Sequence, residues 1–411
     1  MSLDSVPKVC LFFQAHQPYR TLSYDFFQIG SNPDYFDDQK NREILERVCE
    51  HSYIPSCLLF KKLHEATDGN FKFGFGLSGT LIKQLSEWRP DVLELFQELV
   101  SKGIAFLTGG MMTHSLASIF SAQEAARQIQ KHRRLIHETF GVKPTVFANT
   151  ELLYRDDMAK TILALGFNTI LAEGVEDYLG HRSSDYLYHA QDCPEMHVLL
   201  RNGDLSGDVG FRFSDSGWDE HPLSADKFLS WITAEDGPVR NLFLDIETIG
   251  EHQSGETGIF NFWEDFIVKS HDQGISFLAP EDVSDSLPVC EGYSSPKHSS
   301  WADPEKDKSA WQANAMQQEA SQKLFRLQQL VESSKSPALF ASWERLQSAD
   351  HFLSMSTKGG DTGVVHQRFR EHSDPYDCYS YFMNILADLQ IRSKVSMAKN
   401  ILDSSKELLD Q

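Results

Sequence analysis

With 411 residues, 41% hydrophobic and 11% aromatic, the chain is long enough to bury a large core and has the composition of a globular enzyme. Its formal charge is −21, from 38 basic and 59 acidic side chains, which argues against nucleic acid or an anionic membrane as a partner because both would repel it. We therefore expect no nucleic-acid and no membrane partner, whereas a neutral substrate is compatible with this charge.

The six cysteines are scattered without C-x-x-C spacing, which favours a reducing compartment over a disulfide framework or a zinc site. The N-terminal apolar run is too short for a signal sequence and leads into polar residues. No stretch approaches the roughly 20 apolar residues that a membrane span requires. These features predict a cytoplasmic protein.

Strand and helix patterns alternate from the start of the chain. Residues 9–15 (VCLFFQA) form a continuous apolar run, which is typical of a strand buried on both faces, and Pro18 cannot extend its ladder. Residues 121–140 form a long helical pattern with Ser121 as N-cap and Glu124 three residues later, as in a capping box. The other elements expected up to residue 172 are helix 41–63, strand 71–77, helix 90–102, strand 104–107, strand 145–148, helix 157–165 and strand 169–172.

The second half continues the alternation and then changes character. Its expected elements are strands 196–200 and 210–213 with a polar turn at 202–204 between them, helix 225–233, strand 242–244, helix 258–270 and strand 275–278. Residues 280–308 are rich in Ser, Pro, Asp and Lys and are expected to form a connecting loop. Beyond them we expect helices at 309–333, 337–354 and 375–409, with a flexible loop at 357–363.

This order predicts an α/β fold with a parallel sheet and helical crossovers. Polar residues directly follow the strands, and in a closed β/α barrel such positions meet at one mouth. These residues are His16, His114, Glu151, Glu173 and Asp245. An open doubly wound sheet is the competing layout, but no G-x-G-x-x-G follows the first strand. We expect a catalytic domain over residues 1–290 and a helical domain over residues 291–411.

The stretch 241–253 (NLFLDIETIGEHQ) has a high density of groups that carry or shuttle protons. Its apolar run ends at Asp245, and Glu247, Glu251 and His252 follow within seven residues. Such groups are costly to place at the end of an apolar strand without a purpose. The alternative is that Asp245 caps a helix that starts near Glu247.

Glu151 and Asp245 are candidates for a catalytic carboxylate pair, because each ends a predicted strand. Glycoside hydrolysis needs two carboxyl groups that flank one bond: one protonates the leaving oxygen, and the other attacks the sugar carbon or activates water. The acid must stay protonated, and Glu247 and Glu251 are candidate negative neighbours for Asp245. For Glu151 the alternative is a cap of the following helix.

The histidines and tryptophans admit further roles. His16, His114 and His252 are candidate metal ligands together with the carboxylates, but no HxxxH or HxH spacing supports this, and a lone histidine is more often a hydrogen-bonded buried or loop residue. Trp301, which follows two serines, suits a sugar subsite because an indole stacks on the apolar face of a pyranose ring. Trp311 lies in a run of helix formers and is expected in the core.

Five stretches together resemble a known family. LFFQAHQPYR, GGMMTHSLAS, FANTELLY, FLDIETIGEHQ and SSWADPEKDKSAWQANAMQ resemble, in order and separation, the five sequence regions of glycoside hydrolase family 57, and most of all its α-amylase group. DYFDDQKNREIL near the start, and LQSADHFLSMSTK and DPYDCYSYFMNILADL near the end, are also similar to that group. The resemblance therefore spans nearly the whole chain, and five regions in the right order are a far stronger signal than any one of them.

The resemblance implies a retaining mechanism on α-glucans, carried by an incomplete (β/α)7 barrel with parallel strands that is followed by a helical segment. Matched residue by residue, it makes Glu151 the nucleophile and Asp245 the general acid/base, and it implies neither a metal nor an organic cofactor. The residues it places in the sugar site are His16, His114 and Trp301, the last on a loop contributed by the C-terminal domain. Gln17, His252 and Asp303 stand in the same stretches and are assigned to substrate binding as well.

The chain departs from the family pattern in three regions. Met112 and Thr113 stand where two tyrosines usually precede the histidine. Ala148 stands in place of an arginine, and Ile246 and Ile249 in place of an aromatic pair. Losing these aromatic rings changes the stacking available to sugar rings and so the expected preference for substrate length. Both carboxylates are kept, which favours activity.

We predict an intracellular α-amylase that acts on glycogen, starch or maltodextrin. A sugar acceptor in place of water would give 4-α-glucanotransfer or branching on the same residues, because the outcome depends on whether water or a glucan hydroxyl wins the second step. A catalytically silent glucan-binding protein and a metal-dependent deacetylase or hydrolase are the other classes left open.

Overall fold

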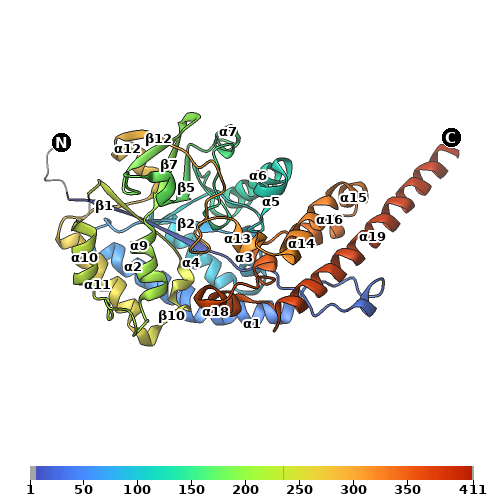
Figure 1. The fold of residues 1–411 in the computed structure, drawn as a ribbon, viewed down its shortest axis with the longest axis horizontal. Coiled ribbons are helices and arrows are strands. Elements are labelled where there is room, and N and C mark those ends of the chain that lie inside the picture. The colour runs from blue at the N-terminus through green and yellow to red at the C-terminus, as the bar shows by residue number, and fades with distance from the viewer. Residues whose placement is uncertain (1–5, 235, 410–411) are drawn as a thin grey trace. The chain divides into compact units, whose positions relative to one another are not determined.

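The computed structural model describes residues 6–234 and 236–409 (Figure 1). The chain forms two compact units. The first comprises Met1–Gln17, Glu43–Met112 and Ile129–Ala302, and the second comprises Pro18–Arg42, Thr113–Gln128 and Asp303–Gln411. Each unit therefore combines segments from distant parts of the sequence.

The first unit is built around a curled sheet of parallel strands. Among the described residues, seven strands follow one another around it: β8 (Val239–Asp245), β1 (Lys8–Ala15), β2 (Phe73–Leu77), β3 (Ala105–Leu107), β4 (Val146–Ala148), β5 (Thr169–Glu173) and β7 (Cys193–Arg201). The Gly109 N–H donates to Val146 O at 2.8 Å between β3 and β4, and the Asn202 N–H donates to Asn241 O at 2.9 Å beside the end of β7. The predicted incomplete (β/α)7 barrel is confirmed.

β1 lies in the middle of this sheet, and both of its faces are apolar. It pairs with β8 along most of its length, up to Gln14 opposite Asp245, and its second half pairs with β2. Phe12 lies in the barrel interior, where its ring meets Phe243 edge-on at 5.7 Å between centroids. Phe13 points the other way and packs on the surrounding helices. A strand buried on both faces needs such a continuous apolar run.

Helices connect the strands and pack against the outside of the sheet. They are α1 (Asp38–Val48) and α6 (Ala122–Phe140), which begin in the second unit, and α2 (Ile54–Ala66), α3 (Gly79–Trp88), α4 (Pro90–Ser101), α7 (Met158–Ala164), α8 (Glu176–Leu179), α9 (Gly203–Gly207), α10 (Ala225–Ala234) and α11 (Ile259–Asp272). α12 (Pro280–Ser286) instead contributes Val283 to the apolar cluster of the barrel interior. α2, α10 and α11 pack side by side (Figure 1). A turn of π-helix, Cys49–Tyr53, leads from α1 into α2 and buries Tyr53.

Shorter strands extend the sheet at its margins. β6 (Leu187–Ala190) runs antiparallel to β7 and carries β12 (Val289–Tyr293) on its other side. β11 (Phe277–Leu278) pairs with the beginning of β1. β9 (Ile249–Gly250) and β10 (Gln253–Ser254), which follow β8 in the chain, form a separate two-stranded sheet.

Four local predictions are wrong. The residues expected as strand 210–213 belong mostly to a turn of π-helix, Asp208–Arg212, that continues α9. Asn202 does not start the expected polar turn 202–204: its side-chain oxygen accepts the Leu205 N–H at 3.1 Å and caps α9. The expected loop 280–308 contains α12 and β12, and the expected loop 357–363 includes the start of a helix at Gly360. Asn and Gly occur in caps as readily as in turns, so their pattern alone did not distinguish the two.

The second unit is helical, which confirms the predicted C-terminal helical segment. Its helices are α5 (Ala117–Phe120), α13 (Ser309–Gln312), α14 (Ala315–Arg326), α15 (Gln328–Ser333), α16 (Pro337–Arg345), α17 (Ala349–Leu353), α18 (Gly360–Phe369) and α19 (Pro375–Leu409), together with the 3-10 turn Phe26–Gln28. None of the helices in the described part of the chain combines the length and the apolar content that a membrane crossing requires.

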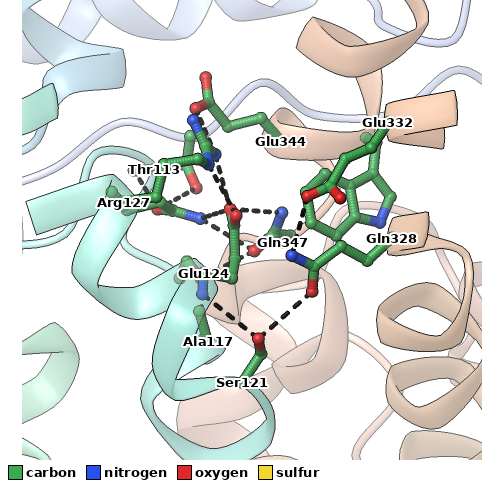
Figure 2. A network of polar contacts seen from close by, with 12 residues as sticks. Thr113, Ala117, Ser121, Glu124, Arg127, Gln328, Glu332, Glu344 and Gln347 are labelled. Carbon is green, nitrogen blue, oxygen red and sulfur yellow. Dashed lines mark hydrogen bonds and ion pairs between the residues drawn. The ribbon is translucent and has the colours of Figure 1, made fainter. Parts of the chain in front are cut away.

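A buried polar network joins the start of α6 to the C-terminal helices of this unit (Figure 2). Glu124 is fully buried and accepts hydrogen bonds from Arg127 at 2.6 Å, Gln128 at 2.9 Å and Gln347 at 3.0 Å. The predicted capping box is therefore only half formed: Ser121 Oγ accepts the Glu124 N–H at 3.2 Å, but the Glu124 carboxylate serves this network instead of the N-cap. A buried carboxylate is tolerated only with such partners.

Candidate active site

The carboxyl ends of the parallel strands gather charged side chains at one end of the barrel. Side chains alternate between the two faces of a strand, so Asp245 faces the same way as Phe243, which lies in the barrel interior. By the same count Glu173 and Arg201, the last residues of β5 and β7, also face inward. The interior is thus apolar along the strands and charged at their carboxyl ends, where β/α barrels carry their chemistry.

Glu151 lies on a strained turn just after β4. Its φ of 48° and the φ of 52° at Leu152 fall in the left-handed region, which is uncommon for residues other than glycine. Ser300 Oγ donates to Glu151 O at 2.8 Å, and the Trp301 N–H donates to the same oxygen at 3.2 Å. The Trp301 indole Nε1–H donates to Oε2 of the Glu151 carboxylate at 2.5 Å. Trp301 therefore contacts Glu151 directly, through both its main chain and its side chain.

Arg201 lies over the Trp301 ring and is paired with Glu173 on the neighbouring strand. The Arg201 guanidinium lies 5.5 Å from the centre of the Trp301 ring, and its Nη1 is 3.1 Å from Oε2 of Glu173. Neither was assigned a role from the sequence, although Glu173 was noted as a strand-end residue. Arg201 could have been found from the sequence, because it is a charged residue at the end of the apolar run 196–200. Asp245 was identified by the same pattern.

Glu151 and Asp245 stand at ends of the barrel strands that are not neighbours. In the strand order, β1, β2 and β3 separate β8 from β4 on one side, and β5 and β7 separate them on the other. The two residues therefore stand on opposite arcs of the barrel, and both are partly buried. Two carboxyl groups placed across one opening are suited to flank a single glycosidic bond.

His16 and Gln17 follow β1, the strand next to β8. His16 Nδ1 lies 2.8 Å from Ser78 Oγ, which also caps α3, so the imidazole is held by the end of β2. The His16 N–H donates to Oε1 of Glu247 at 3.4 Å. Gln17 is buried, and its carbonyl accepts Nε2 of Gln84 at 3.2 Å. The turn after β1 is thus fixed beside the end of β8.

Glu247 is the buried acid of this region. The Tyr53 hydroxyl donates to its carboxylate, as does the His16 N–H. Burial raises the pKa of Glu247 to about 7, although these donors and Gln17 oppose the rise by stabilising the anion. Burial and the nearby Glu247 charge also raise the pKa of Tyr53 well above its usual range, which keeps the phenol a donor.

Glu251 and His252 continue the same segment. Glu251 forms ion pairs with Arg47 at 2.8 Å and with His51 at 3.3 Å, so its carboxylate is engaged by α1 and the π-helical turn. The His252 N–H donates to Glu247 O at 2.8 Å, and the residue is partly buried. The Glu251 side chain is therefore paired with residues of the helical layer, whereas the Glu247 side chain is buried close to the end of β8.

The raised pKa of Glu247 predicts a specific pH dependence of stability. Below pH 4.5 the Glu247 carboxyl group is protonated in both the folded and the unfolded state. Between pH 4.5 and about 7 it loses its proton only in the unfolded chain. The free energy of unfolding therefore falls as pH rises through this window and stays constant above it. A shift of this size corresponds to on the order of 3 kcal/mol. We expect Glu247→Gln to unfold like the wild type in denaturant at pH 5 and to be more stable at pH 8. Parallel pH curves for the two proteins would contradict this.

The structure places His114 and Asp303 in the second unit. His114 is buried with a φ of 51°, and its carbonyl accepts the Ala349 N–H at 2.9 Å. Asp303 is bonded to Nε2 of His366 at 2.7 Å and to Nζ of Lys358 at 2.7 Å. Burial alone would raise the pKa of Asp303, but these two partners outweigh it and hold the pKa below its ordinary value. The carboxylate is therefore an anion tied to α18.

Metal ligation was the other role considered for the histidines. Within the residues that the structure describes, no group of three or more His, Cys, Asp or Glu side chains is arranged to hold a metal ion. Glu247 accepts hydrogen bonds from the Tyr53 hydroxyl and the His16 N–H, and His16 Nδ1 is bonded to Ser78 Oγ.

Sequence comparisons identify relatives over most of the chain. The model described as "Glycosyl hydrolase family 57" matches residues 10–291. A protein from Methanocaldococcus jannaschii named "Putative alpha-amylase" is 36% identical over 412 residues, which cover 97% of this chain and 87% of that protein.

Solved structures share the fold at low sequence identity. A GH57 branching enzyme from Thermococcus kodakaraensis matches with a TM-score of 0.66 at 13% identity, over 89% of this chain and 88% of that one. The α-amylase AmyC from Thermotoga maritima matches with a TM-score of 0.61 at 12% identity, over 94% and 99% of the two chains. The 4-α-glucanotransferase from Thermococcus litoralis matches with a TM-score of 0.59 at 13% identity, over 84% and 54%. At such identities the likeness shows the fold alone.

Proposed function

Because the chain belongs to glycosyl hydrolase family 57, we propose that it cleaves α-1,4-glucosidic bonds in α-glucans such as glycogen, starch and maltodextrins, with retention of the anomeric configuration. The relative named "Putative alpha-amylase" supports hydrolysis as the outcome. The observation that carries the proposal is the placement of Glu151 and Asp245 at opposite arcs of one barrel mouth, with the Trp301 indole bonded to the Glu151 carboxylate.

In the first step Glu151 attacks the anomeric carbon and forms a glycosyl-enzyme ester, while Asp245 gives its proton to the departing glycosidic oxygen. The hydrogen bond from Trp301 holds one carboxylate oxygen of Glu151 and so orients the other toward the sugar. In the second step Asp245 takes a proton from water, the water oxygen attacks the anomeric carbon, and Glu151 leaves as a carboxylate. Two inversions at one carbon give net retention.

We propose that the remaining assigned residues of the first unit bind the glucan. His16 and Gln17 lie on the turn beside the end of β8, and His252 lies just beyond it. Trp301 donates a hydrogen bond to Glu151 and has Arg201 over its ring, and we assign it to the sugar subsite next to the nucleophile. For His114 and Asp303, which belong to the second unit, substrate binding stays an expectation of the sequence.

The same two carboxylates would also serve transglycosylation, which differs only in the acceptor of the second step. Product analysis on maltoheptaose distinguishes the two outcomes. We expect only chains shorter than the substrate, a steady rise in reducing ends, and α-configured new reducing ends in early NMR spectra. Chains longer than maltoheptaose would show transfer, and β-configured products would show inversion; either result overturns part of the proposal.

A further inference from the structure

We propose that Arg201 and Glu173 are positioning residues for the nucleophile, acting through Trp301. The inference rests on the proposed function, because it assigns Glu151 the attack on the sugar. It adds to that function a buried ion pair between residues of β5 and β7. Neither residue belongs to the segment that carries Trp301 or to β4, the strand before Glu151.

The ion pair is built into the barrel and is not a surface contact. Glu173 and Arg201 are directly opposite each other in the β5–β7 ladder, Glu173 is fully buried and Arg201 is 8% exposed. Arg201 Nη1 lies 3.1 Å from the carboxylate of Glu173, and its Nε donates to Phe243 O on β8 at 3.0 Å. Burying two charges is costly unless their geometry is well satisfied, so three strands fix the guanidinium in one place.

From that place the guanidinium meets the indole of Trp301 at 5.5 Å from the ring centre. An arginine over an aromatic face is attracted by the ring quadrupole, most strongly where water is excluded. The same ring donates its Nε1–H to Glu151 at 2.5 Å. A positive charge over the ring draws electron density from it and favours donation by that N–H to the carboxylate. The contacts run in one line: Glu173, Arg201, Trp301, Glu151.

This line matters because the backbone of Glu151 is itself in an uncommon conformation. A carboxylate on a left-handed turn needs outside contacts to keep one orientation. Trp301 gives the carboxylate one bond from its indole N–H, and Ser300 Oγ and the Trp301 N–H each give one to the Glu151 carbonyl. Small misplacements of an attacking group lower the rate of the chemical step more than they weaken binding. Loss of Arg201 is therefore expected to lower kcat while KM stays close to that of the wild type.

The test is a double-mutant cycle on Arg201 and Trp301, measured as kcat and KM on maltoheptaose. We expect Trp301→Phe, which keeps a ring but removes the N–H, to lower kcat by about 10- to 100-fold. Arg201→Met should lower it by about tenfold, and the double variant should be no slower than Trp301→Phe alone, because both changes act on one bond. Arg201→Lys, which keeps the charge, should recover part of the loss.

Arg182→Met is the matched control, since Arg182 lies 5.6 Å from the ring of Tyr188 in the same unit and is also mostly buried. Thermal unfolding of every variant identifies any loss of folded protein, and kcat of the folded fraction for Arg182→Met should equal that of the wild type. Multiplicative effects of the two changes, or an unchanged kcat in folded Arg201→Met, would overturn the positioning role. Full activity of Glu151→Gln would instead overturn the proposed function, so the two failures are distinguishable.

Discussion

Replacing Glu151 by glutamine is expected to lower the turnover of α-glucans by at least about 10⁴-fold, as removal of a covalent nucleophile does in other enzymes. The amide has nearly the same volume as the carboxyl group, and its oxygen can still accept the Trp301 N–H, so the strained turn is expected to keep its shape. What it lacks is the negative charge needed to attack the anomeric carbon. Release of reducing ends from maltoheptaose measures the loss.

Glu264→Gln on α11 is the control for this change, because Glu264 is an exposed acid paired only with Lys62 at 2.6 Å in the described structure. It should match the wild type in activity and unfolding. Turnover by the wild type that disappears in Glu151→Gln excludes a catalytically silent glucan-binding protein. Equal turnover in both variants would remove Glu151 from the reaction and with it the double-displacement scheme.

The barrel could be predicted from the sequence because its strands carry apolar residues on both faces. Phe12 packs inside the barrel and Phe13 outside it, so both faces of this strand must be apolar. The continuous apolar run 9–15 therefore predicts a buried strand. The polar residues after these runs were equally informative, since parallel strands bring their carboxyl ends to one edge. Asp245 and Glu151 were found in this way before any family was considered.

Other features could not be read from local patterns. Asn202 caps a helix where a polar turn was expected, because its side chain serves either purpose and only the tertiary context decides. The bond between Trp301 and Glu151 joins residues 150 positions apart, and no spacing rule reports it. Glu251 is paired with Arg47 and His51, which lie about 200 positions away in the sequence and which no local spacing reports. The roles assigned to Glu151, Asp245 and the sugar-binding residues stay predictions that the variants test.

Replacing Asp245 by asparagine should give a loss that depends on the leaving group, which is the signature of an acid/base. On maltoheptaose we expect kcat/KM to fall by about 10³-fold, because the departing sugar oxygen no longer receives a proton. On α-maltosyl fluoride, whose fluoride leaves without protonation, formation of the glycosyl-enzyme should stay fast. Its hydrolysis should become slow, because water also loses its base, so the ester on Glu151 should accumulate and be visible by mass spectrometry of the intact protein.

Added azide then tests the second step directly. Azide is already an anion and needs no base, so it should release the trapped sugar from Asp245→Asn as an α-glycosyl azide and restore turnover of the fluoride. Glu247→Gln is the matched comparison, since it changes a buried acid two residues away that is bonded to Tyr53 and His16. It should affect maltoheptaose and the fluoride alike. If Asp245→Asn also slowed both substrates equally and ignored azide, the proton transferred in this reaction would have to come from another residue.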